Sequence, residues 1–259
     1  MPLGTTSKHD LVAHLQSLGL SRDTDVVVHS RLISFGVIEG GPQTVYAALR
    51  DLLGPAATIA VPTYTVNNAG PQGDQRDFDP AETPSEAVGV LSEYVRGLPT
   101  AVRSASPTHS HAAVGPKAQI LKRANTNSIN SFGPGSDFDL FLREGFSTLY
   151  LGCSFKEAGT FTFHVEAMFG AIPYREWVEL PRRVKRNGEI DRVSCRYYRR
   201  VSLNAHEDLT IVEDALRQQK KVVSSPCMFG ASHLIRLTDF YGCVLGLLQS
   251  DPTALLTKR

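Results

Sequence analysis

The apolar residues of the chain recur with two periods, and the two periods predict different elements. A helical period predicts helices over residues 7–18, 42–53, 89–96, 117–124, 207–218 and 237–248. Runs of β-branched residues predict strands over residues 25–29, 58–61 and 147–151. Because strands and helices alternate, the pattern favours an α/β fold in which helices flank a mainly parallel central sheet.

Residues 177–204 depart from this pattern, because they are basic and rich in strand-forming residues, with Asn187-Gly188 as a hairpin turn signal. We therefore predict a single domain over residues 1–259 that carries a basic β-hairpin subdomain at about residues 177–204. Its mixture of arginine and tyrosine is typical either of a solvated face or of a surface that binds RNA or a nucleotide handle. The glycine and proline residues of segment 66–84 predict a long loop, and such loops often carry function.

The composition excludes several classes of protein. Lys and Arg number 27 and Asp and Glu 26, so no strong overall charge favours nucleic acid or a membrane surface. The chain has no charged start followed by an apolar run, and no apolar stretch approaches the ~20 residues of a membrane-spanning helix. We expect a cytoplasmic protein without nucleic-acid or membrane partners, whose four cysteines are reduced thiols.

A glycine-rich turn follows the first predicted strand. Gly36, Gly40 and Gly41 precede a helix that begins at Pro42. The free N–H groups of a helix N-terminus, together with the nearby Arg31, suit a phosphate group. The alternative is a tight strand-to-helix turn that needs glycine for its backbone angles. The turn matches neither the dinucleotide-binding nor the Walker pattern.

The run that contains this turn resembles the opening of the aminoglycoside 3-N-acetyltransferases. It has a strand ending in His-Ser, a Gly-Gly turn, a helix ending in Leu-Gly and a strand ending in Pro-Thr. The resemblance continues in order, over roughly residues 8–248, through Phe78-Asp79, Thr83-Pro84-Ser85, Gly89, Glu93, Arg103-Ser104, Phe132-Gly133 and Gly230-Ala231-Ser232. Where the family often has His-Pro, this chain has Ser106-Pro107.

The resemblance implies a direct transfer of the acetyl group from acetyl-CoA to the amine of an amino-sugar type of acceptor, without a metal. The acceptor is an aminoglycoside, an amino-sugar on a nucleotide carrier or another biosynthetic amine. A non-catalytic module that binds anions or nucleotides on the same scaffold is the alternative function. We expect a homodimer as the assembly.

The segment from Gly152 to Glu166 is the richest in chemistry. A histidine with an ordinary pKa suits the removal of a proton from an attacking amine, and a carboxylate can orient its ring. The resemblance implies that His164 is the general base and Glu166 its partner, although the family spacing is His-x-x-Glu. On a strand these two side chains share a face, and on a helix they do not. A route through a Cys153 thioester is the chemical alternative.

The other candidate residues divide between the two substrates. We assign to acyl-CoA binding Ser30, Arg31, Gly36, Gly40, Gly41 and Ser104. We assign to acceptor binding Asp79, Glu93, Glu157 and Thr160, because carboxylates pair with ammonium groups and a hydroxyl can stabilise an oxyanion. His109 and His111 have a spacing that suits a metal on a strand, but no third ligand is apparent, and we expect no metal.

Overall fold

The computed structural model describes residues 4–65, 76–124, 129–186, 188–201 and 206–257. The α-helices are α1 (Lys8–Ser17), α2 (Gly41–Leu53), α3 (Val90–Arg96), α4 (Asp137–Arg143), α5 (Phe155–Ala158), α6 (Phe161–Phe169), α7 (Thr210–Gln218) and α8 (Leu237–Ser250). The strands are β1 (Thr5–Thr6), β2 (Val26–Ser30), β3 (Val37–Ile38), β4 (Ile59–Pro62), β5 (Asp77–Phe78), β6 (Val102–Arg103), β7 (His111–Val114), β8 (Ile129–Asn130), β9 (Ser147–Leu151), β10 (Arg175–Arg186), β11 (Glu189–Arg200), β12 (Val223–Cys227) and β13 (Gly230–Arg236).

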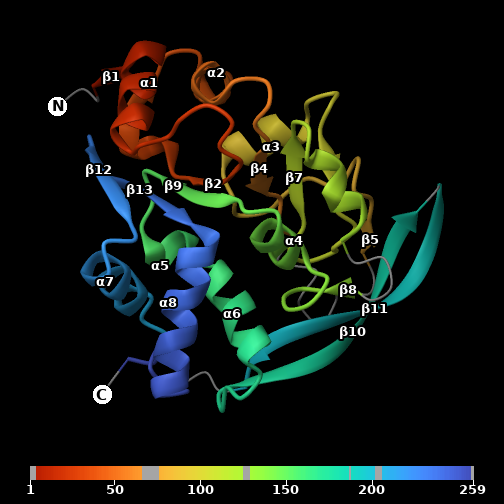
Figure 1. The fold of residues 1–259 in the computed structure, drawn as a ribbon. Coiled ribbons are helices and arrows are strands. Elements are labelled where there is room, and N and C mark those ends of the chain that lie inside the picture. Colours follow the sequence, from red (N-terminus) through yellow and green to blue (C-terminus); the bar gives the residue numbers. More distant parts are fainter. Residues whose placement is uncertain (1–3, 66–75, 125–128, 187, 202–205, 258–259) are drawn as a thin grey trace.

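A seven-stranded sheet crosses the middle of the molecule in the order β12-β13-β9-β2-β4-β7-β6 (Figure 1). Only β9, β2 and β4 run parallel to one another; every other pairing in this sheet is antiparallel. The prediction of a mainly parallel sheet is therefore wrong, and the sheet is mixed. One physical reason is the two-residue turn between Cys227 and Gly230, which is far too short for a parallel crossover.

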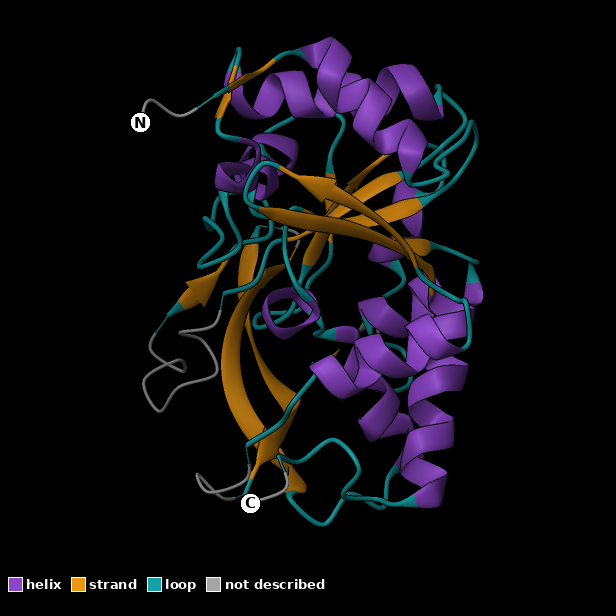
Figure 2. Cartoon of the chain, turned by 90° about the vertical axis from the view of Figure 1, so that its left-hand side faces the viewer, coloured by secondary structure: helices purple, strands orange, loops and turns teal. Residues whose placement is uncertain are grey.

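Helices cover both faces of this sheet (Figure 2). Helices α1, α2 and α3 pack on one face, and α4, α6 and α8 pack on the other. Alternate residues of β2 enter different cores: Val26 and Val28 contact the first group of helices, and Val27 contacts the second. Burial on both faces explains why β2 reads as an uninterrupted apolar run.

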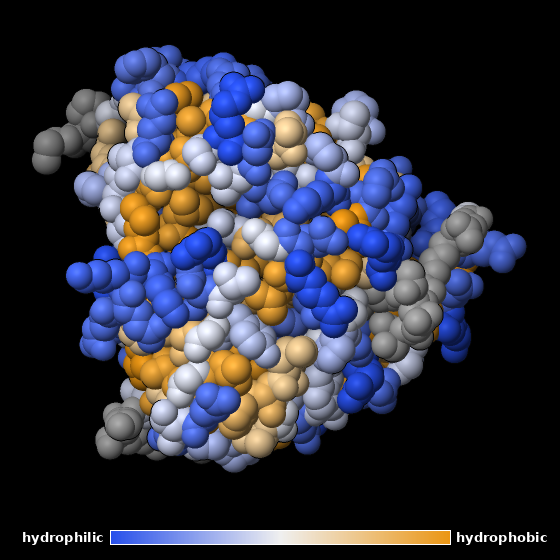
Figure 3. All heavy atoms as spheres, viewed as in Figure 1, coloured by the Kyte–Doolittle hydropathy of each residue, from blue (hydrophilic) through white to orange (hydrophobic). Residues whose placement is uncertain are grey.

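A second sheet stands beside the helices and has the order β5-β10-β11-β8. Strands β10 and β11 form a long antiparallel hairpin in which Arg186 lies opposite Glu189. Four side chains form a small core for this sheet: Phe78, Ile129, Val184 and Cys195. The hairpin curves away from the central sheet in Figure 1, and hydrophilic residues cover most of its visible part in Figure 3.

None of the helices in the described segments is both long and apolar enough to cross a membrane. The four cysteines form no disulfide with one another. Within the described part of the chain, no cluster of three metal-ligating side chains occurs.

Candidate active site

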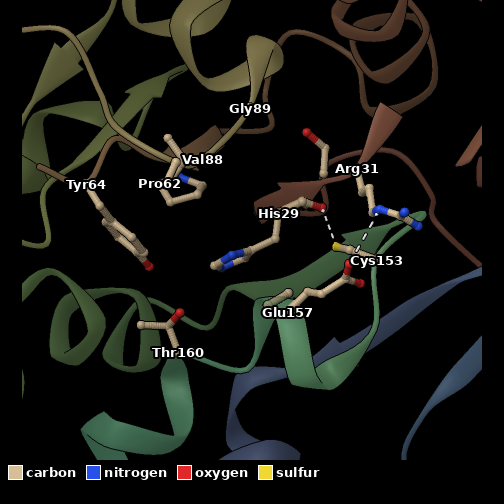
Figure 4. A pocket seen from close by; sticks show the side chains of 12 residues that line it. His29, Arg31, Pro62, Tyr64, Val88, Gly89, Cys153, Glu157 and Thr160 are labelled. Atoms are coloured by element: carbon tan, nitrogen blue, oxygen red, sulfur yellow. Dashed lines mark hydrogen bonds and ion pairs between the residues drawn. The ribbon is translucent and has the colours of Figure 1, made fainter. Parts of the chain in front are cut away.

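A pocket of about 370 Å³ opens where the three parallel strands end (Figure 4). Ligands of α/β proteins commonly bind beyond the carboxyl ends of parallel strands, where the connecting loops meet. The end of β2, the end of β4, the turn after β9 and helix α5 all contribute to its wall. The lining residues are His29, Ser30, Arg31, Pro62, Tyr64, Ala87, Val88, Gly89, Cys153, Glu157, Ala158 and Thr160.

The turn after β9 is held rigidly against the turn after β2. Gly152 has a φ of 70°, and a Cβ atom at this position would lie 2.8 Å from Ser34 Cβ and 2.9 Å from the Arg31 carbonyl oxygen. The Ser34 hydroxyl donates to the Gly152 carbonyl over 2.6 Å, and the Arg31 N–H donates to the Leu151 carbonyl over 3.0 Å. Only glycine permits this approach, which fixes Arg31 and Cys153 on neighbouring parts of the pocket wall.

An ion pair stands at the mouth of the pocket. Arg31 Nε lies 3.5 Å from Glu157 Oε1, and both side chains are about half exposed. The N–H and hydroxyl groups of Ser154 hold the pKa of Glu157 below its ordinary value, with a smaller contribution from Arg31. An exposed pair of this kind contributes little to stability, so Arg31 can exchange its partner for an incoming phosphate.

A second pocket of about 370 Å³ adjoins the first and shares Arg31, Cys153 and Glu157 with it. Its other lining residues include Arg217, Phe229 and His233. The two hollows meet at the Arg31–Glu157 pair, so a long ligand can occupy both.

Inside the first pocket, the Tyr64 hydroxyl belongs to a buried series of polar groups. It lies 3.4 Å from His111 Nε2, and His111 Nδ1 lies 3.0 Å from Asp137 Oδ2. The same carboxylate oxygen accepts a 2.6 Å hydrogen bond from the Ser104 hydroxyl. Thr160 lies beside Tyr64 on the pocket wall (Figure 4), and burial raises the pKa of Tyr64 above its ordinary value.

Two further side chains on the pocket wall are chemically quiet at neutral pH. Burial lowers the pKa of His29 to about 3, so its ring is uncharged. Burial raises the pKa of Cys153 to about 12, and its thiol lies 3.5 Å from the His29 carbonyl oxygen. Because the thiolate is the nucleophilic form, this environment argues against a Cys153 thioester.

The structure separates His164 from Glu166. Both lie on helix α6, where residues two apart point in different directions. Glu166 accepts hydrogen bonds from the Tyr174 hydroxyl at 2.6 Å and from Arg175 Nε at 3.0 Å. Its assignment as the partner that orients His164 is therefore wrong.

His164 itself is fully buried and does not line either pocket. Its Nδ1 atom accepts the Gly133 N–H at 3.2 Å, and its Nε2 atom has no partner among the described residues. Burial lowers the pKa of His164 to about 4. Its role as general base stays a prediction.

The structure brings four of the predicted site residues together in one pocket: Ser30, Arg31, Glu157 and Thr160. It does not bring the others there. Gly36, Gly40 and Gly41 line neither of these pockets, and Ser104 is buried against Asp137.

The two remaining acceptor candidates are bound by the chain's own cations. Asp79 pairs with Lys185 at 2.8 Å, and Glu93 accepts from Arg96 at 3.0 Å. Neither carboxylate lines a pocket described above.

Sequence reasoning missed Tyr64 and Asp137 as functional candidates and considered His111 only as a possible metal ligand. Tyr64 carried a usable signal, because it comes two residues after the end of a buried strand. The pairing of His111 with Asp137 carried none, because only the folded chain places them side by side.

The comparisons with known proteins agree with this architecture. The family model of aminoglycoside 3-N-acetyltransferases matches residues 27–249. Aminoglycoside N(3)-acetyltransferase III of Salmonella sp is 34% identical over 191 residues, which cover 68% of this chain and 65% of that relative. The chain thus spans slightly less than two thirds of that relative's length.

Two further matches cover more of both proteins. Aminoglycoside N(3)-acetyltransferase IV of Salmonella sp is 28% identical over 254 residues, covering 96% of this chain and 90% of the relative. The crystal structure of a mutant of AAC(3)-IVa in complex with a gentamicin superposes with a TM-score of 0.82 at 27% identity, covering 100% of this chain and 94% of the other. The chain therefore belongs to the aminoglycoside 3-N-acetyltransferase family.

Proposed function

We propose that this protein transfers the acetyl group of acetyl-CoA to an amine of an aminoglycoside-type acceptor. The observation that carries the proposal is the pocket at the ends of β2, β4 and β9 in a chain of this family. A cation stands at the mouth of that pocket and hydroxyl groups stand inside it. This arrangement suits a thioester whose phosphate groups bind at the mouth of the pocket and whose reactive carbonyl group lies inside it.

The residues at the mouth fit coenzyme A. Arg31 is half exposed and is held by a loose pair with Glu157 and by a 3.4 Å hydrogen bond to the Ser34 hydroxyl, so it is available to a phosphate. Arg217 lies on the adjoining pocket beside its ion-pair partner Glu213, 2.7 Å away, and is a second cation on the same path once a phosphate displaces that carboxylate. Thr160, inside the first pocket, is placed to donate a hydrogen bond to the thioester oxygen as charge develops on it.

The charges of the hairpin favour a cationic acceptor over a sugar nucleotide. Several hairpin cations are matched by nearby carboxylates: Arg183 by Asp77, Lys185 by Asp79, Arg196 by Glu179 and Arg199 by Glu176. These carboxylates reduce the net positive charge of the hairpin, so it attracts an anionic acceptor less than its number of cations suggests. The same pairing weighs against the alternative of a non-catalytic anion-binding module.

The first test is acceptor-dependent release of coenzyme A thiol. Purified protein is mixed with acetyl-CoA and gentamicin, and thiol release is compared with the same acceptor after chemical protection of its amines. We expect thiol release only with free amines, with one acetyl group found on the acceptor by mass spectrometry for each thiol released.

The protected acceptor is the matched control, because it keeps the sugar scaffold and loses only the nucleophile. Thiol release that does not depend on free amines would indicate a thioesterase. No release with any member of a broad amine panel would refute the proposed function.

A further inference from the structure

We propose that the adjoining pocket binds the nucleotide end of coenzyme A, with the adenine ring on Phe229 and the 3′-phosphate on Arg217 in exchange for Glu213. This inference rests on the proposed function and adds a basis for the choice of donor. Coenzyme A carries an adenosine with a 3′-phosphate and a 5′-diphosphate. Pantetheine and the phosphopantetheine arm of a carrier protein lack the adenosine, so such a site distinguishes between their thioesters.

Segments that are far apart in the sequence form the adjoining pocket. Helix α7 contributes Arg217, and the turn between β12 and β13 contributes Phe229. Helix α7 packs beside α5, which carries Glu157 (Figure 1). Because Arg31 and Glu157 belong to both pockets, a ligand whose reactive carbonyl lies in the first pocket reaches the adjoining pocket with its opposite end.

The backbone of Phe229 is fixed, and its side chain is open to a ligand. The Phe229 N–H donates to the Ser34 carbonyl oxygen over 2.9 Å, which attaches the turn to the segment that follows Arg31. Phe229 is about half exposed and lines the adjoining pocket. Met228, the other residue of the turn, packs against the backbone at Gly4, where a Cβ atom would lie 2.6 Å from its Cε atom. An exposed aromatic ring beside cations is typical of a base-stacking surface, because every nucleobase presents a π-face.

The two cations of the adjoining pocket correspond to different phosphates. Among the described residues that line it, the cations are Arg31 and Arg217, and burial lowers the pKa of His233, so its ring is uncharged at neutral pH. Arg31 is shared with the first pocket, so it lies nearer the thioester and meets the diphosphate. Arg217 lines the adjoining pocket alone and meets the more distant 3′-phosphate.

Glu213 competes with the 3′-phosphate for Arg217. The guanidinium Nη2 atom lies 2.7 Å from Glu213 Oε1, and the Arg217 side chain is 45% exposed, so a phosphate can reach it from solvent. An exposed pair of this kind contributes little to stability. A phosphate carries more charge than a carboxylate and suits the same bidentate geometry, so it replaces Glu213 as the partner of Arg217.

The first test compares ligands that differ only at the nucleotide end. Isothermal titration calorimetry measures the dissociation constants of coenzyme A, 3′-dephospho-coenzyme A and pantetheine with the wild-type protein. We expect coenzyme A to bind roughly tenfold more tightly than the dephospho form, because that form lacks the charge-assisted hydrogen bonds to Arg217. Pantetheine should bind more weakly than both.

A second test removes the stacking surface. Phe229→Ala should weaken coenzyme A binding by roughly tenfold, the usual loss when a base no longer stacks on an aromatic ring, and leave pantetheine binding unchanged. Phe229→Tyr should restore the affinity, because it keeps the ring. Val223→Ala is the matched control, since Val223 is an exposed apolar residue of the same hairpin that lines neither pocket.

A third test uses two substitutions with opposite expected effects. Arg217→Gln should weaken coenzyme A binding by roughly tenfold, whereas Glu213→Gln should strengthen it by roughly two- to fivefold, because the competing carboxylate is gone. Neither variant should change the affinity for 3′-dephospho-coenzyme A by more than about twofold. Arg236→Gln is the matched control, because Arg236 is exposed, pairs with Asp239 and lines neither pocket.

The outcomes separate this inference from the proposed function. Coenzyme A affinities within about twofold of wild type in both Phe229→Ala and Arg217→Gln would overturn the inference, and so would equal binding of coenzyme A and pantetheine. Both side chains are about half exposed, so these variants should fold, and thermal melting checks this. The binding measurements need no acceptor. A protein that binds coenzyme A in the predicted way but acetylates no amine would refute the proposed function and support this inference.

Discussion

Among single residues, the buried histidines show how the fold controls protonation. Burial lowers the pKa of His29 and of His109 to about 3 and the pKa of His164 to about 4. An imidazole in such surroundings stays uncharged at neutral pH, because its positive form would lose the hydration that water supplies. These residues therefore make the stability of the protein sensitive to acid.

His164 gives a prediction with a definite sign. Between about pH 6.5 and pH 4 the unfolded chain binds a proton at this position and the folded chain does not. The free energy of unfolding should thus fall as the pH drops through this window, by at most about 1.4 kcal/mol per pH unit for one histidine.

The measurement compares wild-type protein with His164→Asn, whose side-chain oxygen can still accept the Gly133 N–H. Urea unfolding at several pH values should show a shallower acid loss of stability in the variant. Equal slopes would mean that the imidazole becomes protonated as easily in the folded protein as in the unfolded chain.

The sequence was informative where a residue's role depends on its immediate neighbours. Ser30 and Arg31 follow a strand that its β-branched run identifies, and the structure places both on the pocket. The role of Glu166 could not be predicted in this way, because the sequence of its segment is compatible with either a strand or a helix. The structure shows that the segment is a helix. The contacts of His111 with Tyr64 and with Asp137 span 47 and 26 residues, and no local pattern encodes such a distance.

At the scale of secondary structure elements, Arg103 at the end of β6 joins several segments around the pocket. Its guanidinium donates to the carbonyl groups of Thr63 and Thr83 and to the Ser110 hydroxyl. These contacts tie the end of β4 to the segment that leads into the pocket lining at Ala87–Gly89 and to the start of β7.

Arg103→Lys should loosen this junction, because an ammonium group cannot reach the planar set of acceptors that a guanidinium reaches. We expect a loss of roughly 2 kcal/mol in the free energy of unfolding and a higher KM for both substrates. Arg236→Lys is the matched control, since Arg236 is largely exposed and its ion pair is with Asp239 alone among the described residues. Unchanged stability in Arg103→Lys would show that the junction does not depend on Arg103.

The helical period of the apolar residues predicted the helices on one face of the sheet correctly. The alternation of strands and helices did not predict the directions of the strands. Residues 7–18 and 42–53 became α1 and α2. Strand direction depends on which strands become neighbours, and this is decided by packing across the whole sheet. The antiparallel β7 and β13 therefore lay beyond what alternation of strands and helices could predict.

In the molecule as a whole, the resemblance to the family carried the information that local patterns lacked. The ordered series of weak motifs identified the family, and the family model and the structural matches confirm that identification. The motifs could not show where the pocket lies, because its wall is assembled from segments between residues 29 and 160. The proposed reaction depends on that assembly.

The most direct test of this account is the crystal structure of the protein with coenzyme A and an amine acceptor. We expect the sulfur atom inside the pocket beside Tyr64 and Thr160, with the arm of the coenzyme passing Arg31 toward the adjoining pocket. Coenzyme A bound elsewhere, such as in the hollow lined by Arg96, Arg103 and Lys122, would contradict the account.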